Sequence, residues 1–226
     1  MSSSPLSILI IGSGVAGQTT ALELRRKLPP NTQIRILERS AAPIASGDFF
    51  TVGPSAIKIF RHYPILQAEN EKIAYDPWVS YHKHTGECVI PPGPAFVSSG
   101  EGGEEPARIY RHHRPKFHHM LFEELERQGI EVEYGRYVVA YFESEAKGGV
   151  ILKSGEKIEA DLVVAADGVG TKSHLLVAGK KIEAKSNGYA IFRTAYPVEL
   201  ALADKEVAER FKLLENGRSV NEIWAG

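Results

Sequence analysis

A short glycine-rich segment near the N-terminus constrains the fold of this 226-residue chain more than any other feature. It reads Gly12-Ser13-Gly14-Val15-Ala16-Gly17 and directly follows the apolar, β-branched run Leu6–Ile11. Such a run is typical of a parallel strand that is buried on both faces. An amphipathic pattern continues to about Leu28, where two prolines end it, and a second strand is expected at Gln33–Leu37. This order predicts a βαβ unit at the start of the chain.

Each glycine of the segment has a physical role in such a unit. Gly12 permits the tight turn, Gly14 lets the backbone approach a pyrophosphate, and Gly17 lets the helix and strand pack closely. The phosphates would lie at the helix N-terminus, where unpaired N–H groups and the helix dipole favour negative charge. Glu38 follows Gly17 by twenty-one residues and is placed to accept hydrogen bonds from an adenosine ribose. A glycine-rich turn without a ligand is the alternative, but the surrounding strand, helix and acid favour a dinucleotide site.

The choice of dinucleotide follows from the acid and from what comes after it. An acid at Glu38 disfavours the 2′-phosphate of NADP at this site and leaves NAD and FAD. A plain NAD domain would continue with strands and helices at short spacing, whereas this chain makes a long excursion and returns with closely spaced strands. Those strands are expected at Tyr137–Glu143, Gly149–Lys153, Lys157–Glu159 and Asp161–Ala166. The excursion favours FAD, because added segments must reach its isoalloxazine ring.

The rest of the chain carries weaker patterns. Trp78–His82 and Glu87–Ile90 alternate around Thr85-Gly86, which predicts a hairpin. Residues 91–106 are rich in Gly, Pro, Ser and Glu and predict a surface loop that includes the acidic cluster 101–105. The other expected elements are a loop at 46–53, helices at Ser55–Arg61, Pro115–Gln128 and Leu200–Leu214, and strands at Ser186–Pro197 and Ser219–Trp224.

Composition and charge exclude several classes of protein. Lys and Arg number 27 against 28 Asp and Glu, so no global field steers the chain onto nucleic acid. The single cysteine, Cys88, gives no sign of a disulfide-stapled secreted scaffold. The early apolar run is too short to span a bilayer and lacks the features of a signal peptide. These observations predict a cytoplasmic protein without a membrane segment.

The sequence does not support two further classes of site. His112, His113, His118 and His119 suggest a metal centre, but adjacent histidines point to different faces and no Cys or carboxylate stands at a known ligand spacing. No metal is therefore expected. A Ser-His-Asp hydrolase would need a nucleophile elbow, and the sequence contains no such signature.

Three blocks of sequence resemble one family. The first is the glycine segment with Glu38-Arg39; the second, Arg111–Leu121, matches an Arg-x-x-(Leu/Phe)-x-x-x-Leu helix start; the third, Asp161–Ser173, contains an Asp-Gly motif. In these blocks the chain resembles the N-terminal part of the FAD-dependent aromatic-hydroxylase-type monooxygenases, the class of para-hydroxybenzoate hydroxylase. The similarity is strongest to versions from fungal secondary-metabolite pathways.

The resemblance implies an α/β fold: a Rossmann-like FAD-binding domain with an inserted, incomplete β-rich substrate region. The FAD-binding domain would comprise residues 1–75 and 107–180. The partial substrate region would comprise residues 76–106 and 181–226. The cofactors it implies are FAD, with NADPH or NADH as the reductant.

The resemblance also assigns site residues. Arg114 would contact the flavin's phosphate or ribityl region, where a guanidinium suits an anionic partner; otherwise it is a solvated helix-start arginine. Asp167 would fix the Asp-Gly turn near the pyrophosphate, or else be an ordinary turn residue. The full cofactor-binding set is Gly12, Gly14, Gly17, Glu38, Arg114, Asp167 and Gly168.

Arg193 is the expected catalytic residue. By resemblance it would position a phenolate, although a single arginine on a strand is usually a surface residue. The implied activity is hydroxylation of a phenolic or polyketide-like small molecule with NAD(P)H and O₂.

Two departures from the family keep alternatives open. The family's Gly-Ala-Gly-Ile…Pro-Asn-Ala loop is here Gly47-Asp48-Phe49-Phe50…Pro54-Ser55-Ala56, and Phe49 would crowd an approach of backbone to FAD. A later Gly-Asp motif that binds the flavin is not present. The alternatives to an autonomous enzyme are a fragment, a truncated non-catalytic remnant, or one half of a split flavoprotein whose partner chain would supply the C-terminal half. A third hypothesis is an NAD-dependent dehydrogenase, but the Asp167-Gly168 motif argues against it.

Overall fold

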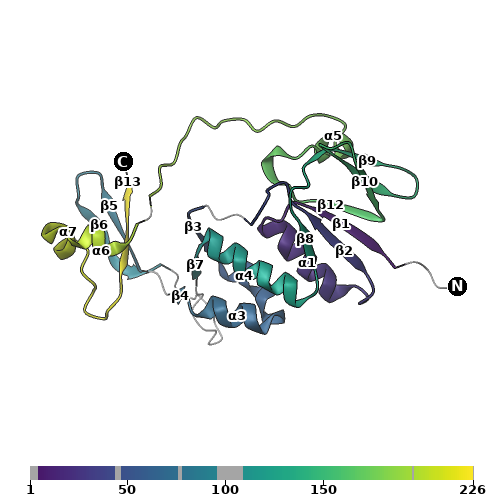
Figure 1. Cartoon of the computed structure of the whole chain (residues 1–226). Helices are drawn as coiled ribbons and strands as arrows, with labels where there is room; N and C mark the ends of the chain where they lie inside the picture. Colours follow the sequence, from purple (N-terminus) through teal and green to yellow (C-terminus); the bar gives the residue numbers. More distant parts are fainter. Residues whose placement is uncertain (1–4, 44–46, 76–77, 96–108, 195, 226) are drawn as a thin grey trace, which may run out of the picture. The chain divides into compact units, whose positions relative to one another are not determined.

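The computed structural model describes residues 5–43, 47–75, 78–95, 109–194 and 196–225 (Figure 1). The chain divides into two compact units. The first unit comprises Met1–Gly47 and Pro115–Ile191, and the second comprises Asp48–Arg114 and Phe192–Gly226. Within the second unit, strands in 48–75 pair with a strand in 109–113. The division into an FAD-binding domain and a substrate region stays a prediction.

A four-stranded parallel sheet forms the centre of the first unit. Its order is β12-β1-β2-β8. The strands are β1 (Ser7–Ile11), β2 (Gln33–Leu37), β8 (Glu131–Glu133) and β12 (Leu162–Ala165). Ile10 of β1 lies between Val164 and Ile36 and is fully buried. The predicted strands at β1, β2 and β12 are confirmed. Burial along the strand holds for β1, whereas β2 alternates between exposed and buried residues. The burial expected for β12 is wrong, because this strand lies at the edge of the sheet and is partly exposed.

Two longer helices accompany this sheet in the sequence order that the patterns predict. Helix α1 spans Val15–Lys27 and buries Ala21 and Leu22. Helix α4 spans Arg114–Arg127, with Pro115 in its first turn, where proline costs no hydrogen bond. The apolar positions Phe117, Leu121 and Leu125 are at most 3% exposed, so the helical periodicity correctly identified the buried face.

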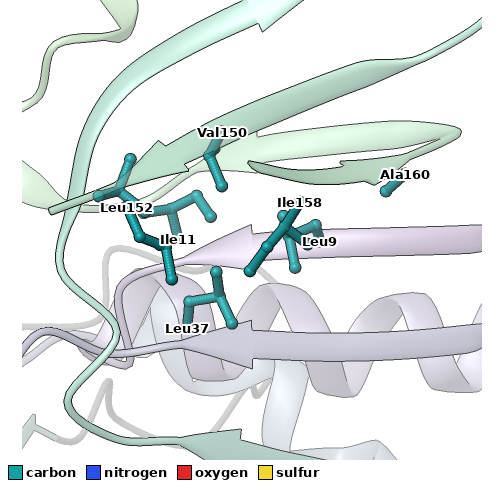
Figure 2. Close-up of a cluster of buried hydrophobic side chains, with 8 residues drawn as sticks. Leu9, Ile11, Leu37, Val150, Leu152, Ile158 and Ala160 are labelled. Carbon is teal, nitrogen blue, oxygen red and sulfur yellow. The ribbon is translucent and has the colours of Figure 1, made fainter. Parts of the chain in front are cut away.

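An antiparallel meander follows β8 and completes the core of the first unit. It consists of β9 (Val138–Glu143), β10 (Gly148–Leu152) and β11 (Lys157–Ala160), in the order β11-β10-β9. Figure 2 shows side chains of the meander pointing toward those of β1 and β2. The buried cluster is Leu9, Ile11, Leu37, Val138, Val150, Leu152, Ile158 and Ala160. The short 3₁₀ helix η2 (Gly168–Gly170) and helix α5 (Ser173–Val177) come after β12.

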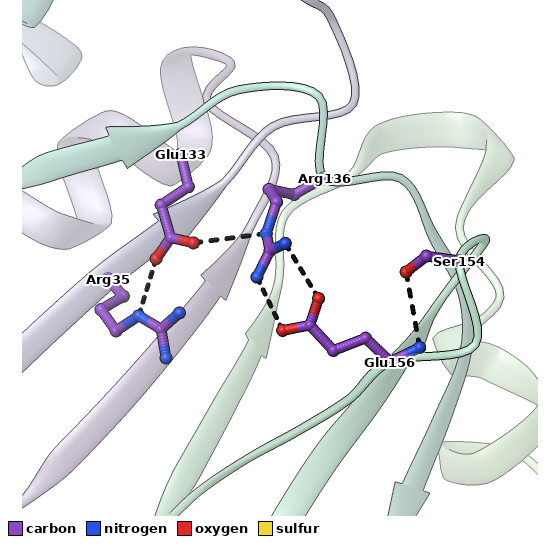
Figure 3. A network of polar contacts seen from close by, with 5 residues as sticks. All are labelled: Arg35, Glu133, Arg136, Ser154 and Glu156. Carbon is purple, nitrogen blue, oxygen red and sulfur yellow. Dashed lines mark hydrogen bonds and ion pairs between the residues drawn. The ribbon is translucent and has the colours of Figure 1, made fainter.

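A polar network joins the meander to the parallel sheet at its surface (Figure 3). Both terminal nitrogens of Arg136 donate to the carboxylate of Glu156 at 2.9 Å. The Nε of Arg136 lies 3.3 Å from Glu133, which also accepts from Arg35 at 2.7 Å. The arginine therefore ties the β10–β11 turn to strands β8 and β2.

The second unit contains a small antiparallel sheet of order β3-β7-β4. Its strands are β3 (Phe49–Val52), β4 (Ala74–Tyr75) and β7 (Ile109–His113), with α2 (Pro54–Ile57), η1 (Lys58–His62) and α3 (Pro64–Glu71) between β3 and β4. The expected loop at 46–53 is wrong over Phe49–Val52. That strand exists through long-range pairing with β7, which no local pattern reveals.

The other sheet of the second unit has the order β13-β5-β6. The predicted hairpin is confirmed as β5 (Trp78–Lys83) and β6 (Cys88–Pro94), and β13 (Val220–Ala225) pairs with β5 in parallel. The loop expected from residue 91 is wrong over its first four residues, because β6 continues to Pro94. Its prolines are tolerated since β6 is an edge strand. The rest of that expected loop, residues 96–106, lies outside the described residues.

Two expectations for the C-terminal part are wrong. The strand expected at Ser186–Pro197 is absent over the described residues 186–194 and 196–197, and Phe192 is fully exposed there. Strand-like alternation without a partner strand does not suffice to form a sheet. The helix expected at Leu200–Leu214 is instead α6 (Val198–Leu202) and α7 (Lys205–Arg210), because Asp204 caps a new helix. No helix in the described ranges is long and apolar enough to cross a membrane.

Candidate dinucleotide site at the glycine turn

The turn between β1 and α1 is built so tightly that two of its positions admit only glycine. Gly12 has φ +97°, and a Cβ there would lie 2.6 Å from the carbonyl oxygen of Ala166. At Gly17, a Cβ would lie 1.9 Å from the carbonyl oxygen of Gly12. Neither contact is compatible with a side chain. These two glycines therefore bring the turn, the start of α1 and the end of β12 together.

Gly14 differs from them, because a Cβ at this position would meet nothing within 4 Å. It is the N-cap of α1, has ordinary extended backbone angles, and provides no side-chain cap; the first turn of the helix also contains no acidic residue. The first N–H groups of a helix lack intrahelical partners and attract anions. The space beside Gly14 and the uncapped helix end thus fit the pyrophosphate of a dinucleotide.

Glu38 lies at the end of β2 and points back to this turn. It is 6% exposed, and its carboxylate accepts the Ser13 N–H at 2.9 Å and the Ser40 N–H at 2.9 Å. Burial alone would raise the pKa of Glu38, but these hydrogen bonds outweigh it and hold the pKa below its usual value. The carboxylate is therefore charged near neutral pH, as required of an acceptor for ribose hydroxyls.

Asp167 also lies close to the turn. A Cβ on Gly12 would lie 3.0 Å from the Cα of Asp167, and the Ala166 N–H donates to the Ile11 carbonyl at 2.8 Å. The Asp167 Oδ1 and the Tyr141 hydroxyl are both buried, and the two side chains interact. Burial, and after it the charge of Asp167, raises the pKa of Tyr141.

Two of the expected site residues are grouped apart from the glycine turn. Arg114 and Arg193 belong to the second unit. Arg114 begins α4, and its backbone N–H donates to the Asp48 carbonyl at 3.1 Å. Arg193 donates from a terminal nitrogen to the Phe49 carbonyl at 3.2 Å. The side chain of Phe49 is itself exposed within the second unit.

One residue at the glycine turn was missed as a site residue. His118 of α4 is buried, and its Nε2 lies 2.6 Å from the Ser13 carbonyl oxygen. The sequence drew attention to it only within a histidine cluster. No group of three or more His, Cys, Asp or Glu side chains in the described ranges is arranged to hold a metal. His118 could have been found from its spacing in the Arg111–Leu121 block, where it lies one helical turn after Arg114.

The strand, the glycine turn, the open helix end and the buried acid define a Rossmann-like unit of the kind that binds dinucleotides. Comparisons with known proteins refine this class. The chain is 40% identical to an FAD-dependent monooxygenase of Claviceps purpurea and 39% identical to the FAD-dependent monooxygenase dmxR9 of Cryptosporiopsis sp.. Each match covers 98% of this chain but only 44% and 43% of the relative.

A solved structure shares the fold, and a family model matches part of the chain. The crystal structure of CtdE in complex with FAD matches 97% of this chain and 52% of that one, with a TM-score of 0.74 and 23% identity. A family model described as pyridine nucleotide-disulphide oxidoreductase matches residues 104–196. Over nearly all of its length the chain is similar to the N-terminal part of FAD-dependent monooxygenases from fungi. It spans less than half the length of the curated relatives.

Proposed function

We propose that this chain binds FAD at the glycine turn and forms the cofactor-binding part of a monooxygenase. The observation that carries the proposal is the open, uncapped N-terminus of α1 at Gly14, next to the charged carboxylate of Glu38. The enzyme would hydroxylate a phenolic or polyketide-like small molecule with NADPH or NADH and O₂. The substrate class comes from the family resemblance, and the cofactor site comes from the residues.

In this proposal the chain's own groups bind and orient the dinucleotide. The N–H groups of Gly14 and of the first residues of α1 donate to the pyrophosphate. Glu38 accepts the ribose hydroxyls with lone pairs that the Ser13 and Ser40 N–H groups leave free. Asp167 holds the neighbouring turn, with Gly168 following it, and Arg114 contacts the flavin's phosphate or ribityl region. When bound, FAD supplies the redox and oxygen-transfer chemistry.

Arg193 is the proposed substrate-positioning residue. It lines an open cavity of about 910 Å³ in the second unit together with Arg111, Phe49, Phe50 and Phe192. Aromatic rings suit a planar substrate, and a guanidinium favours the anionic form of a phenol. Arg193→Gln should therefore raise the concentration of phenolic ligand needed for binding more than it affects a neutral aromatic ligand.

A second candidate is one half of a split flavoprotein, and the exposed edge of the parallel sheet favours it. Strand β12 is apolar throughout yet lies at an edge, and Leu162 is 46% exposed there. The opposite edge strand, β8, carries Glu131 and Glu133 and is polar in the usual way. A groove of about 430 Å³ runs along β12 beside Leu176 of α5. In this candidate, a further strand from the remainder of the flavoprotein pairs with β12.

The two candidates are separated by co-expression. The full chain would be produced alone and together with the C-terminal segment of the Claviceps relative that this chain does not span. Bound flavin and phenol-dependent NAD(P)H oxidation by the chain alone would support an autonomous enzyme. Activity only in the co-expressed pair would support the split flavoprotein. A chain that retains no flavin in either preparation contradicts both candidates.

A further inference from the structure

Ser13, between the first two glycines of the turn, is held from both of its sides. Its N–H donates to Glu38 at 2.9 Å, and its carbonyl oxygen lies 2.6 Å from Nε2 of His118. All three residues are buried, with exposed fractions of 1% for Ser13, 6% for Glu38 and 5% for His118. Two buried side chains, one after β2 and one on α4, therefore fix a single residue of the glycine turn.

The His118 contact has a defined direction. A carbonyl oxygen only accepts, so His118 carries its proton on Nε2 and donates it to Ser13. The side-chain amide of Gln18, fully buried on α1, lies 2.9 Å from the same ring nitrogen, and with Nε2 protonated the amide presents its oxygen there as an acceptor. The ring is thus enclosed between the glycine turn and the helix that follows it. It has no route to act as an exposed acid or base.

The contact with His118 also sets the direction of the Gly14 N–H, which belongs to the same peptide group as the Ser13 carbonyl. In a trans peptide, the carbonyl of Ser13 and the N–H of Gly14 belong to one plane and point in opposite directions, and the chain contains no cis peptide in its described part. Holding the Ser13 carbonyl toward His118 aims the Gly14 N–H away from α4. It therefore faces away from His118 at the residue where a Cβ would meet only open space.

We propose that His118 is a positioning residue for the dinucleotide site, which aims the Gly14 N–H at the pyrophosphate by holding the Ser13 carbonyl. This inference rests on the proposed function, since the pyrophosphate is that of FAD. Glu38 holds the other side of Ser13, so the pair fixes the peptide before the cofactor arrives. Preorganisation of this kind increases affinity by removing an ordering cost from binding.

The test compares three variants of the full chain. His118→Leu removes the donor, whereas His118→Gln retains an N–H at the length of the imidazole Nε2. His119→Leu is the matched control, because His119 is the next residue on the same helix and its side chain is 69% exposed. The dissociation constant for FAD is measured by flavin fluorescence, and amide hydrogen exchange of residues 11–18 is measured without FAD.

We expect His118→Leu to raise the dissociation constant roughly tenfold, the value of one buried hydrogen bond, and to speed exchange at the turn. His118→Gln should stay within about threefold of the wild type, and His119→Leu should equal it. If His118→Leu does not fold, His118→Asn is compared with His118→Gln instead, because the asparagine amide side chain is shorter. If the wild type binds FAD and all variants show the same dissociation constant and the same amide exchange, the role of His118 is overturned while the proposed function stands. A wild-type chain that binds no FAD overturns the proposed function, and this role with it.

Discussion

The carboxylate of Glu38 accepts the backbone N–H of Ser13 at 2.9 Å, so the end of the second strand is bonded directly to the glycine turn. The acid is therefore already ordered before any ribose is bound. It also occupies the Ser13 N–H, which leaves the N–H groups from Gly14 onward to meet a phosphate. One side chain thus sets both the ribose acceptor and the donors that remain.

Glu38→Gln should destabilise the chain and weaken FAD binding. The new amide group would place an N–H₂ against one of the backbone N–H donors, which costs about 1–3 kcal/mol of unfolding free energy. The lowered pKa of Glu38 adds a pH dependence, because its contribution is present above the unfolded value near 4.3 and is lost as the pH falls through the lower folded value. Urea unfolding at several pH values measures both effects. Glu159→Gln, at an exposed position of β11, is the control, and equal curves for the two variants would contradict the role of Glu38.

Gly17→Ala and Gly14→Ala should separate folding from binding. At Gly17 the new Cβ would lie 1.9 Å from a backbone oxygen, so we expect a loss of about 3 kcal/mol or more, at the upper end of overpacking costs. At Gly14 the new Cβ meets nothing within 4 Å, so stability should stay within about 0.5 kcal/mol of the wild type. FAD affinity should nevertheless fall, because the methyl group fills the space proposed for the pyrophosphate. Thermal unfolding and an FAD titration measure the pair, and unchanged affinity in Gly14→Ala would argue against that space as the binding site.

His112 should make the second unit sensitive to mild acid. Its Nε2 lies 2.7 Å from the Asn70 Oδ1, and burial lowers the pKa of His112 to about 4. The unfolded chain, with a histidine pKa near 6.5, then binds more protons between about pH 6.5 and pH 4. Stability is therefore full above pH 6.5 and decreases as the pH falls through this window. His112→Gln should flatten that slope, whereas His119→Gln, at an exposed position, should retain it. A slope that survives His112→Gln would assign it to another group.

Arg136→Met should lower stability by about 0.5–1 kcal/mol, because a bidentate pair within a network contributes more than an isolated surface pair. The effect should shrink in high salt as the charges are screened. Lys72→Met breaks an exposed single pair with Glu69 on α3 and should change stability by less than about 0.5 kcal/mol. Urea unfolding at low and high salt compares them. An Arg136→Met loss that does not depend on salt would point to packing in place of charge.

Local sequence patterns predicted the first unit well. The apolar runs at Ile8–Ile11 and Leu162–Ala165 sit in a parallel sheet, and the spacing of Phe117, Leu121 and Leu125 gave the buried face of α4. These elements can be predicted locally, because their apolar residues are consecutive in the strands and periodic in the helix.

The second unit was less accessible to the same reasoning. Strand β3 forms because Phe49–Val52 pairs with β7, more than fifty residues later. No local pattern shows such a pairing. The site shows the same limit. Gly12, Gly14, Gly17 and Glu38 form a local signature, whereas the contact of His118 with Ser13 depends on how α4 packs.

The visible absorption spectrum of the purified full chain, after incubation with FAD and desalting, tests the central claim most directly. We predict a retained flavin spectrum in the wild type that is reduced in Gly14→Ala, although that variant remains folded. A folded but colourless wild-type chain would contradict the claim that the glycine turn, with Glu38, holds FAD in this chain.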